Sequence, residues 1–183
     1  MTSNEEQLAA PSEDFQYYID QYKIKHAEGY TSFAKFSPTY LDRERIKEVC
    51  LKYNVKTLLD YGIAQGVHYT EMKLHEYWEL DSYTGYDPAV ERFSQKPTGK
   101  FDAVLCYDTL EHVPEGSIDY VIQDLLSFSD KLALVRVETS PAATILPNGE
   151  NAHITLHTKE WWKEKFLQHR RPGQIIVFHG LEI

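Results

Sequence analysis

Cysteine is scarce in this sequence. Only two occur among the 183 residues, Cys50 and Cys106, and each stands among apolar neighbours. So few cysteines exclude the disulfide framework of small secreted domains and fit a reducing compartment. The first residues, MTSNEEQLAAPSEDF, have neither the basic start nor the apolar centre of a secretory signal. We therefore expect a cytoplasmic protein.

Long apolar runs and positive charge are also missing. No stretch approaches the roughly 20 apolar residues that cross a bilayer, so the sequence predicts no membrane association. Lys and Arg number 19 against 28 Asp and Glu, a formal net charge of −9. This charge repels phosphate backbones and argues against a nucleic-acid partner. A small-molecule partner is expected instead, and the oligomeric state is left open.

The composition that remains is typical of one globular domain. Apolar residues make up 42 % of the chain and charged residues 26 %. We expect a flexible tail over residues 1–13 and a single domain over 14–183. Residues 14–54 form a helical N-terminal extension in this prediction, with helices over about 14–28 and 39–53.

Short apolar segments then alternate with amphipathic ones. The predicted strands are Val55–Tyr61, SYTGYDP, FDAVLCYDTL, KLALVRVET and GQIIVFHGLEI. The predicted helices are VHYTEMKLHEYWEL, SIDYVIQDLLSFS with Ser117 as its cap, and KEWWKEKFLQ with Thr158 as its cap. This alternation predicts an α/β fold with a mainly parallel sheet flanked by helices.

The turn after the first predicted strand is the most informative segment. It reads TLLDYGIAQG, with Gly62 and Gly66 between a strand and a helix. The segment lacks the Lys of a mononucleotide loop and the glycine spacing of a dinucleotide site. Asp60 would also repel a pyrophosphate, whereas it would attract a cofactor with a cationic amino-acid end.

These residues resemble motif I of the class I S-adenosylmethionine-dependent methyltransferases, an acid followed by x-Gly-x-Gly-x-Gly. Ala64 stands at the middle glycine. YTGYDP is similar to the family's second strand, whose final acid, here Asp87, holds the ribose. FDAVLCYDTLEHVPE is similar to the fourth strand and the segment after it. The resemblance covers about 120 residues and implies a Rossmann-like class I methyltransferase fold.

The resemblance implies S-adenosylmethionine as the cofactor. Its binding residues would be Asp60, Gly62, Ala64, Gly66, Asp87, Asp108 and Leu110. The chain from Asp87 to Phe101 is short, so the third-strand region of the family is shortened and its adenine-contacting acid is missing. How the adenine is held is left open.

Three residues are candidates for the acceptor side, because each follows a predicted strand. Glu111 and His112 come after the third strand, and His153 lies in the polar loop after the fourth. With Asp108 they resemble the metal set of small-RNA 2′-O-methyltransferases, and Glu-His also occurs after this strand in ubiquinone-biosynthesis O-methyltransferases. The set implies Mg²⁺, Mn²⁺ or Zn²⁺. The alternative is that Glu111 and His112 shape the pocket without metal.

The sequence thus predicts an enzyme that methylates oxygen. LPNGENAH with the later WW resembles uncharacterised methyltransferases of bacteria, phages and saccharide-modification clusters, which favours a small polar or saccharide acceptor. Three alternatives stay open: an RNA 2′-O-methyltransferase, a non-catalytic S-adenosylmethionine-binding module and a nicotinamide-dependent oxidoreductase.

Overall fold

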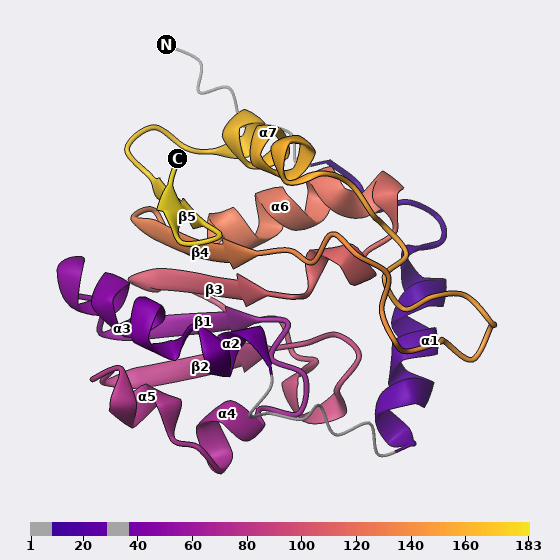
Figure 1. Cartoon of the computed structure of the whole chain (residues 1–183), viewed down its shortest axis with the longest axis horizontal. Coiled ribbons are helices and arrows are strands. Elements are labelled where there is room, and N and C mark those ends of the chain that lie inside the picture. Colours follow the sequence, from indigo (N-terminus) through magenta and orange to yellow (C-terminus); the bar gives the residue numbers. More distant parts are fainter. Residues whose placement is uncertain (1–8, 29–36) are drawn as a thin grey trace.

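A six-stranded sheet is the centre of the structure, a computed structural model that describes residues 9–28 and 37–183 (Figure 1). Residues 1–8 of the expected tail and 29–36 of the expected extension lie outside the described residues. The strands are β1 Thr57–Tyr61, β2 Ser82–Tyr86, β3 Ala103–Tyr107, β4 Leu132–Arg136, β5 Ile175–Phe178 and β6 Leu181–Glu182. Their order is β2-β1-β3-β4-β5-β6, parallel except for β6. The predicted α/β class and mainly parallel sheet are therefore confirmed.

Helices cover both faces of the sheet. They are α1 Phe15–Ala27, α2 Pro38–Leu41, α3 Arg43–Lys52, α4 Val67–Thr70, α5 Leu74–Tyr77, α6 Ile118–Ser127 and α7 Lys159–His169. Short 3-10 turns occupy Glu91–Phe93, Leu110–His112 and Glu115–Ser117. Thr158 caps α7 as predicted, because its side chain accepts from the Trp161 backbone. Ser117 makes no such cap, and its hydroxyl instead pairs with Ser12 at 2.6 Å.

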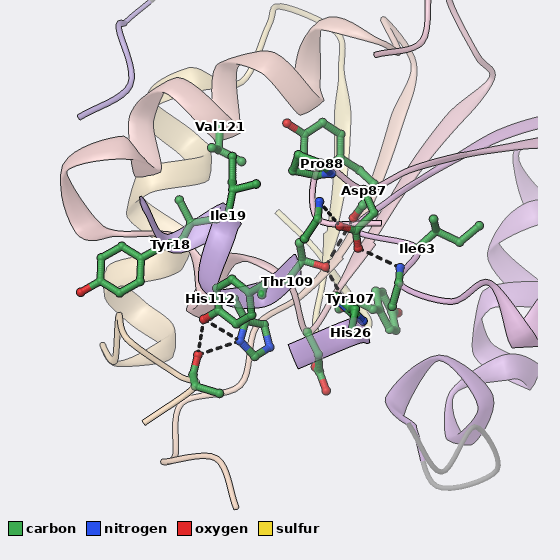
Figure 2. Close-up of a pocket in the computed structure, with 18 of the residues that line it drawn as sticks. Tyr18, Ile19, His26, Ile63, Asp87, Pro88, Tyr107, Thr109, His112 and Val121 are labelled. Carbon is green, nitrogen blue, oxygen red and sulfur yellow. Dashed lines mark hydrogen bonds between the residues drawn. The ribbon is translucent and has the colours of Figure 1, made fainter. Parts of the chain in front are cut away.

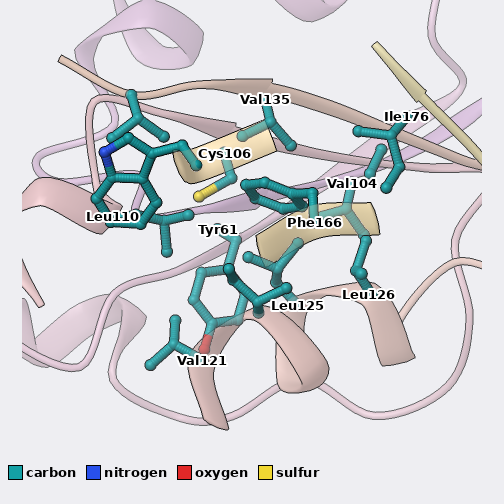
Figure 3. Packing of buried hydrophobic residues seen from close by; sticks show 14 of the residues in the cluster. Tyr61, Val104, Cys106, Leu110, Val121, Leu125, Leu126, Val135, Phe166 and Ile176 are labelled. Carbon is teal, nitrogen blue, oxygen red and sulfur yellow. The ribbon is translucent and has the colours of Figure 1, made fainter. Parts of the chain in front are cut away.

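The strands alternate their side chains between two cores. On one face Val104, Cys106 and Val135 pack against α6 and α7, where Trp162 and Phe166 are fully buried (Figure 3). On the other face Leu58, Leu105 and Leu134 pack against α3 and α5. Every residue of β3 is buried, which is the pattern of a central parallel strand covered on both sides. The result is a helix–sheet–helix sandwich.

Three elements that the sequence predicts as continuous are each divided into two in the structure. The helix expected over 39–53 is broken into α2 and α3 at Asp42, which leaves helical geometry with ψ of 8°. The helix expected after Gly66 is two short ones, because Lys73 takes a left-handed φ of 52°. The last predicted strand is a hairpin, since His179 and Gly180 both have positive φ and turn the chain from β5 into β6.

The switch point of the sheet lies between β1 and β3. The chain goes from β1 outward to β2 and then returns to the other side of β1. Residues 88–100, all described, contain the turn Glu91–Phe93 and no strand, so β2 is the sheet edge there. In open α/β sheets ligands bind beyond the carboxyl ends of the strands at this point. Figure 1 shows α1 lying across these ends.

Candidate functional site

A cavity of about 480 Å³ opens at the switch point. This volume falls within the roughly 300–1,000 Å³ of small-molecule sites. Its floor is made by the residues at the ends of β1, β2 and β3, and its sides by α6 and the loop over 140–153. One face of α1 covers it, and Tyr18, Ile19 and His26 of this face line the cavity together with Asp87, Thr109 and His112 (Figure 2). The cavity is therefore lined by segments that lie far apart in the sequence, from Phe15 to His153.

The turn after β1 approaches the neighbouring strand closely. Gly62 has a φ of 94°, and a Cβ on it would lie 2.2 Å from Thr109 Oγ1, so only glycine fits. Ala64 also takes a positive φ, 49°, so it adopts the conformation that a glycine at this position would favour. Its backbone N–H donates to Asp87 Oδ2 at 2.9 Å. The turn and the end of β2 are thus joined beside the cavity.

Three carboxyl groups line this cavity. Asp60 is buried and accepts from the Tyr69 hydroxyl at 2.8 Å, and burial raises its pKa to about 7 with a smaller effect of Asp87. Burial also raises the pKa of Asp87, against the hydrogen bonds from Ala89 and Ala64. Burial raises the pKa of Asp108 to about 6, which the Arg136 guanidinium opposes. Burial is therefore the largest influence on the pKa of all three carboxyl groups.

Two predicted cofactor residues lie outside the cavity. Gly66 lies at the N-terminus of α4 with a positive φ of 61°. A Cβ on Gly66 would lie 2.9 Å from the Phe93 ring, so the residue allows the turn to pack closely against Phe93. Leu110 is fully buried in the core beside α6. Asp60, Gly62, Ala64, Asp87 and Asp108 do line the cavity. The structure thus brings five of the seven together and corrects the placement of Leu110.

The three acceptor-side candidates form one cluster. Glu111, His112 and His153 each offer a ligand atom, and these atoms lie within 4.8 Å of one another. They come from the turn after β3 and from a loop 40 residues later in the chain. Asp108 is not in this cluster, because its Oδ1 faces Arg136 Nε at 3.6 Å. The predicted metal set of four is therefore reduced to three residues.

The hydrogen bonds of the two imidazoles fix their tautomers. His112 Nδ1 lies 2.7 Å from the Ala152 carbonyl, and His153 Nδ1 lies 2.6 Å from the Ser140 carbonyl. Since a carbonyl only accepts, each Nδ1 carries a proton, and Nε2 is the nitrogen that carries the lone pair when the ring is neutral. Burial and the neighbouring His153 lower the pKa of His112 to about 4, so it is neutral at pH 7.

Glu111 is the buried member of the cluster. Its Oε1 accepts from the Glu138 backbone at 2.9 Å, while its buried Oε2 has no hydrogen-bond partner among the described residues. Burial raises the pKa of Glu111 to about 8, and Asp108 adds to this. A buried carboxylate oxygen without a partner costs stability and calls for a ligand or a proton.

Sequence reasoning missed the residues of α1 and α6 that line the cavity. Phe15, Tyr18, Ile19 and Tyr22 have helical spacing and all line the cavity, and Phe15 also packs against the core. His26, Tyr120 and Asp124 also line it. The excess of aromatic residues in α1 was the available signal, but a stripe of this kind is equally typical of a core face.

Comparison with models of protein families and with curated proteins gives no match to this chain. None of the helices within residues 9–28 and 37–183 is long and apolar enough to span a bilayer. The functional conclusion therefore depends on the chemistry of the cavity itself.

Proposed function

We propose that this protein is an S-adenosylmethionine-dependent methyltransferase that acts on an oxygen of a small polar or saccharide acceptor. The observation that carries the proposal is the convergence of Asp60, Asp87 and the Gly62–Ala64 turn on one enclosed cavity at the switch point. The cofactor has a cationic sulfonium and a cationic amino group, and both are attracted to buried carboxylates.

The same charges argue against a nicotinamide dinucleotide. A pyrophosphate binds at the N-terminus of a helix, where backbone N–H groups and the helix dipole attract it. Here the helix after the turn, α4, has only four residues, and Asp60 lies beside the turn. A pyrophosphate would therefore meet a carboxyl group and little compensation from the short helix.

Asp87 is positioned to hold a ribose. Its two oxygens each accept one backbone N–H, from Ala64 and Ala89, both at 2.9 Å. A carboxylate has about four acceptor positions, so at least one per oxygen is left for ribose hydroxyls. The backbone bonds fix the carboxylate in place, which reduces the entropy lost on binding.

Methyl transfer is an in-line displacement at the sulfonium methyl. The carbon–sulfur bond breaks as the carbon–oxygen bond forms, and the acceptor hydroxyl loses its proton. The protein contributes alignment and a water-poor cavity, both of which lower the barrier. His153 lines the cavity, and its Nε2 lone pair is available to accept the hydroxyl proton.

The cluster of Glu111, His112 and His153 fits a divalent metal. Two imidazoles with Nδ1 bonded to carbonyls and a buried carboxylate oxygen without a partner among the described residues are a typical donor set. We propose that these residues hold Zn²⁺, Mn²⁺ or Mg²⁺, of which the nitrogen ligands favour Zn²⁺. Such an ion lowers the pKa of a hydroxyl that it binds. In the alternative, the pocket holds no metal and His153 is the base, and the methyl acceptor would bind beside His153 in both cases.

Calorimetric titration tests the proposal. S-adenosylhomocysteine, the product without the reactive methyl, is expected to bind with a micromolar Kd, and NAD is expected not to bind. Asp87→Ala is expected to weaken binding at least about tenfold, because it removes the acceptor of the ribose hydroxyls. Binding of NAD instead of the sulfur cofactor would overturn the proposal.

Turnover distinguishes the enzyme from a binding module. Radiolabelled S-adenosylmethionine would be incubated with sugars, small alcohols and small RNA ends. Label in the sugar or alcohol fraction supports the proposal. Label in RNA would identify the acceptor as a ribose 2′-hydroxyl, whereas tight binding without any transfer would favour a non-catalytic module.

A further inference from the structure

The Asn151 side chain joins the two halves of the loop over 140–153. Its Nδ2 donates to the Ala142 carbonyl at 2.8 Å, and the Ala142 backbone N–H donates to its Oδ1 at 2.9 Å. The side-chain amide thus exchanges the same pair of hydrogen bonds that a facing backbone residue would exchange. Asn151 therefore continues the pairing of this loop with a side chain.

The continuation begins where the backbone pairing stops. The loop folds back on itself, and among the described residues its last backbone hydrogen bond runs from the Ala152 N–H to the Thr144 carbonyl at 3.0 Å. Ala142 lies beyond this bond on the incoming half of the loop, and His153 lies beyond it on the outgoing half. The spacing of these two residues therefore depends on side chains.

The Asn151 amide contacts both of them. Its Oδ1 accepts from the His153 backbone N–H at 2.9 Å as well as from the Ala142 N–H. An amide oxygen has two lone pairs, so one atom can accept both bonds. The backbone of His153 is thereby held at a fixed distance from Ala142.

This distance determines whether the His153 ring keeps its partner. His153 Nδ1 lies 2.6 Å from the Ser140 carbonyl, two residues before Ala142. The bond is exposed, so water competes for the ring N–H and the net gain from the bond is small. The bond is kept only while Ser140 and His153 stay at this spacing, which Asn151 maintains.

The Ser140 end is held by a different residue. The Glu138 carboxylate accepts from the Ser140 N–H at 3.1 Å and from the Ser140 hydroxyl at 2.9 Å. The Glu138 N–H in turn donates to Glu111 Oε1 at 2.9 Å. Ser140 is thus connected to Glu111 of the cluster, and Asn151 supplies the matching support on the His153 side.

We propose that Asn151 is a positioning residue for His153. By fixing the loop spacing it keeps the ring bonded to Ser140 in the Nδ1–H tautomer, which leaves the Nε2 lone pair for a metal ion or for the acceptor proton. The use of this lone pair rests on the proposed function. The tautomer itself is a property of the protein without any ligand.

Histidine NMR on the full chain, treated with a chelator and without cofactor, tests the assignment. Long-range ¹H–¹⁵N spectra at a pH where the rings are neutral distinguish the two tautomers, and His112→Gln and His153→Gln identify the signals. In the unmodified protein His153 is expected to show the Nδ1–H form alone. In Asn151→Ala it is expected to show a mixture with the Nε2–H form, because the ring exchanges Ser140 for water.

His112 is the internal reference in the same spectra. Its Nδ1 bonds to the Ala152 carbonyl, and the backbone bond from Ala152 to Thr144 does not involve the Asn151 side chain. Its signal is therefore expected to stay unchanged in Asn151→Ala. A change of both rings would mean that the variant has lost the whole loop, and it would overturn a specific role of Asn151 toward His153.

Asn148→Ala is the matched control. Asn148 lies in the same loop, but its amide bonds only to Glu150, with Oδ1 accepting from the backbone at 3.0 Å and Nδ2 donating to Oε2 at 2.6 Å. The His153 tautomer is expected to be the same as in the unmodified protein. A single Nδ1–H form in Asn151→Ala, or the same mixture in Asn148→Ala, would overturn the assignment.

Calorimetry with Zn²⁺ alone then measures the consequence for the cluster. Asn151→Ala is expected to lower the affinity about 10- to 100-fold, the usual effect of losing a residue that orients a metal ligand, and Asn148→Ala is expected to leave it unchanged. Equal affinities in the two variants would overturn the connection to a metal site. If the unmodified protein binds neither Zn²⁺ nor S-adenosylhomocysteine, the proposed function fails, while the tautomer ratio still decides the role of Asn151.

Discussion

The Tyr22 hydroxyl and the His112 ring share one acceptor. The Ala152 carbonyl oxygen lies 2.6 Å from the Tyr22 hydroxyl and 2.7 Å from His112 Nδ1, and these two donors are 3.3 Å apart. The rings also pack edge-on, with centroids 5.3 Å apart. Helix α1 thus contacts a histidine of the acceptor cluster that lies 90 residues later in the chain.

This contact predicts that Tyr22 positions His112. Tyr22→Phe keeps the ring packing and removes the hydroxyl, so His112 is held less firmly in its tautomer. We expect Zn²⁺ affinity to fall about 2- to 10-fold, which corresponds to one neutral hydrogen bond, and S-adenosylhomocysteine affinity to stay unchanged. Calorimetry with each ligand measures both. Tyr17→Phe, at a half-exposed position of the same helix, is the control, and equal effects of the two variants would contradict the positioning role.

Glu111→Gln tests the metal cluster. The amide has nearly the same shape but no charge, so Zn²⁺ or Mn²⁺ affinity, measured on protein treated with a chelator, is expected to fall at least 100-fold. Folding is expected to persist, because the buried carboxylate already favours its neutral form. Glu115→Gln is the control, because the same substitution is made at an exposed residue of the next turn, which pairs with His157. Unchanged metal affinity in Glu111→Gln would indicate that the cluster only shapes the pocket.

Asp60 makes stability depend on pH in a defined direction. Its pKa is about 7 in the folded protein, against about 3.9 in an unfolded chain. Between these values the folded state binds a proton that the unfolded state has released, so the free energy of unfolding falls as pH rises. Asp60→Asn is expected to reduce this fall by up to about 1.4 kcal/mol per pH unit between pH 5 and 6.5.

Urea denaturation at half-unit pH steps measures this slope. Asp102 provides the contrast, because its hydrogen bond from Lys131 holds its pKa at about 2. A lowered pKa contributes stability that is lost only in acid, so Asp102→Asn is expected to leave the slope between pH 5 and 6.5 unchanged. A slope in Asp60→Asn equal to that of the unmodified protein would show that Asp60 is ionised in the cavity.

Alanine substitutions at Gly62 and Gly149 distinguish the cost of a positive φ from the cost of a steric clash. Their φ values are 94° and 88°, but a Cβ on Gly149 would meet nothing within 4 Å. Gly149→Ala is expected to cost about 1–2 kcal/mol of unfolding free energy, the strain of positive φ alone. Gly62→Ala must also displace Thr109, so we expect a cost at least about 1 kcal/mol larger and loss of S-adenosylhomocysteine binding. Equal costs in urea denaturation would mean that Thr109 moves freely.

The fold class was predictable because its signals are local. The segment Ala103–Tyr107 is apolar throughout, and in the structure it is buried on both faces as a central parallel strand. The breaks were not predictable in the same way. Lys73 takes positive φ, which few residues other than glycine, asparagine, aspartate and histidine adopt, so the sequence has no marker there. Tertiary contacts outweigh intrinsic propensity at such positions.

The cavity residues likewise divide into those that the sequence predicts and those that it does not. Gly62, Ala64 and Asp87 were predictable because the turn and the strand end fix their positions within a few residues of β1 and β2. Leu110 and Glu111 are neighbours in one 3-10 turn, but Leu110 points into the core and Glu111 joins the cluster. The sequence alone does not show which of the two side chains is directed into the core, because the packing of α6 decides which side of the turn is covered.

The sequence by itself determined the order of strands and helices, the burial of the central strands and the turn at the end of β1. Apolar periodicity and glycine positions encode these features along short lengths of chain. Only the tertiary structure decided that α1 covers the cavity, that His153 meets Glu111 and His112, and that Asp124 of α6 lines the same cavity. These relationships join residues some 40 to 130 positions apart. They depend on how whole elements pack, because the entropy of closing such long loops is offset only by the complete core.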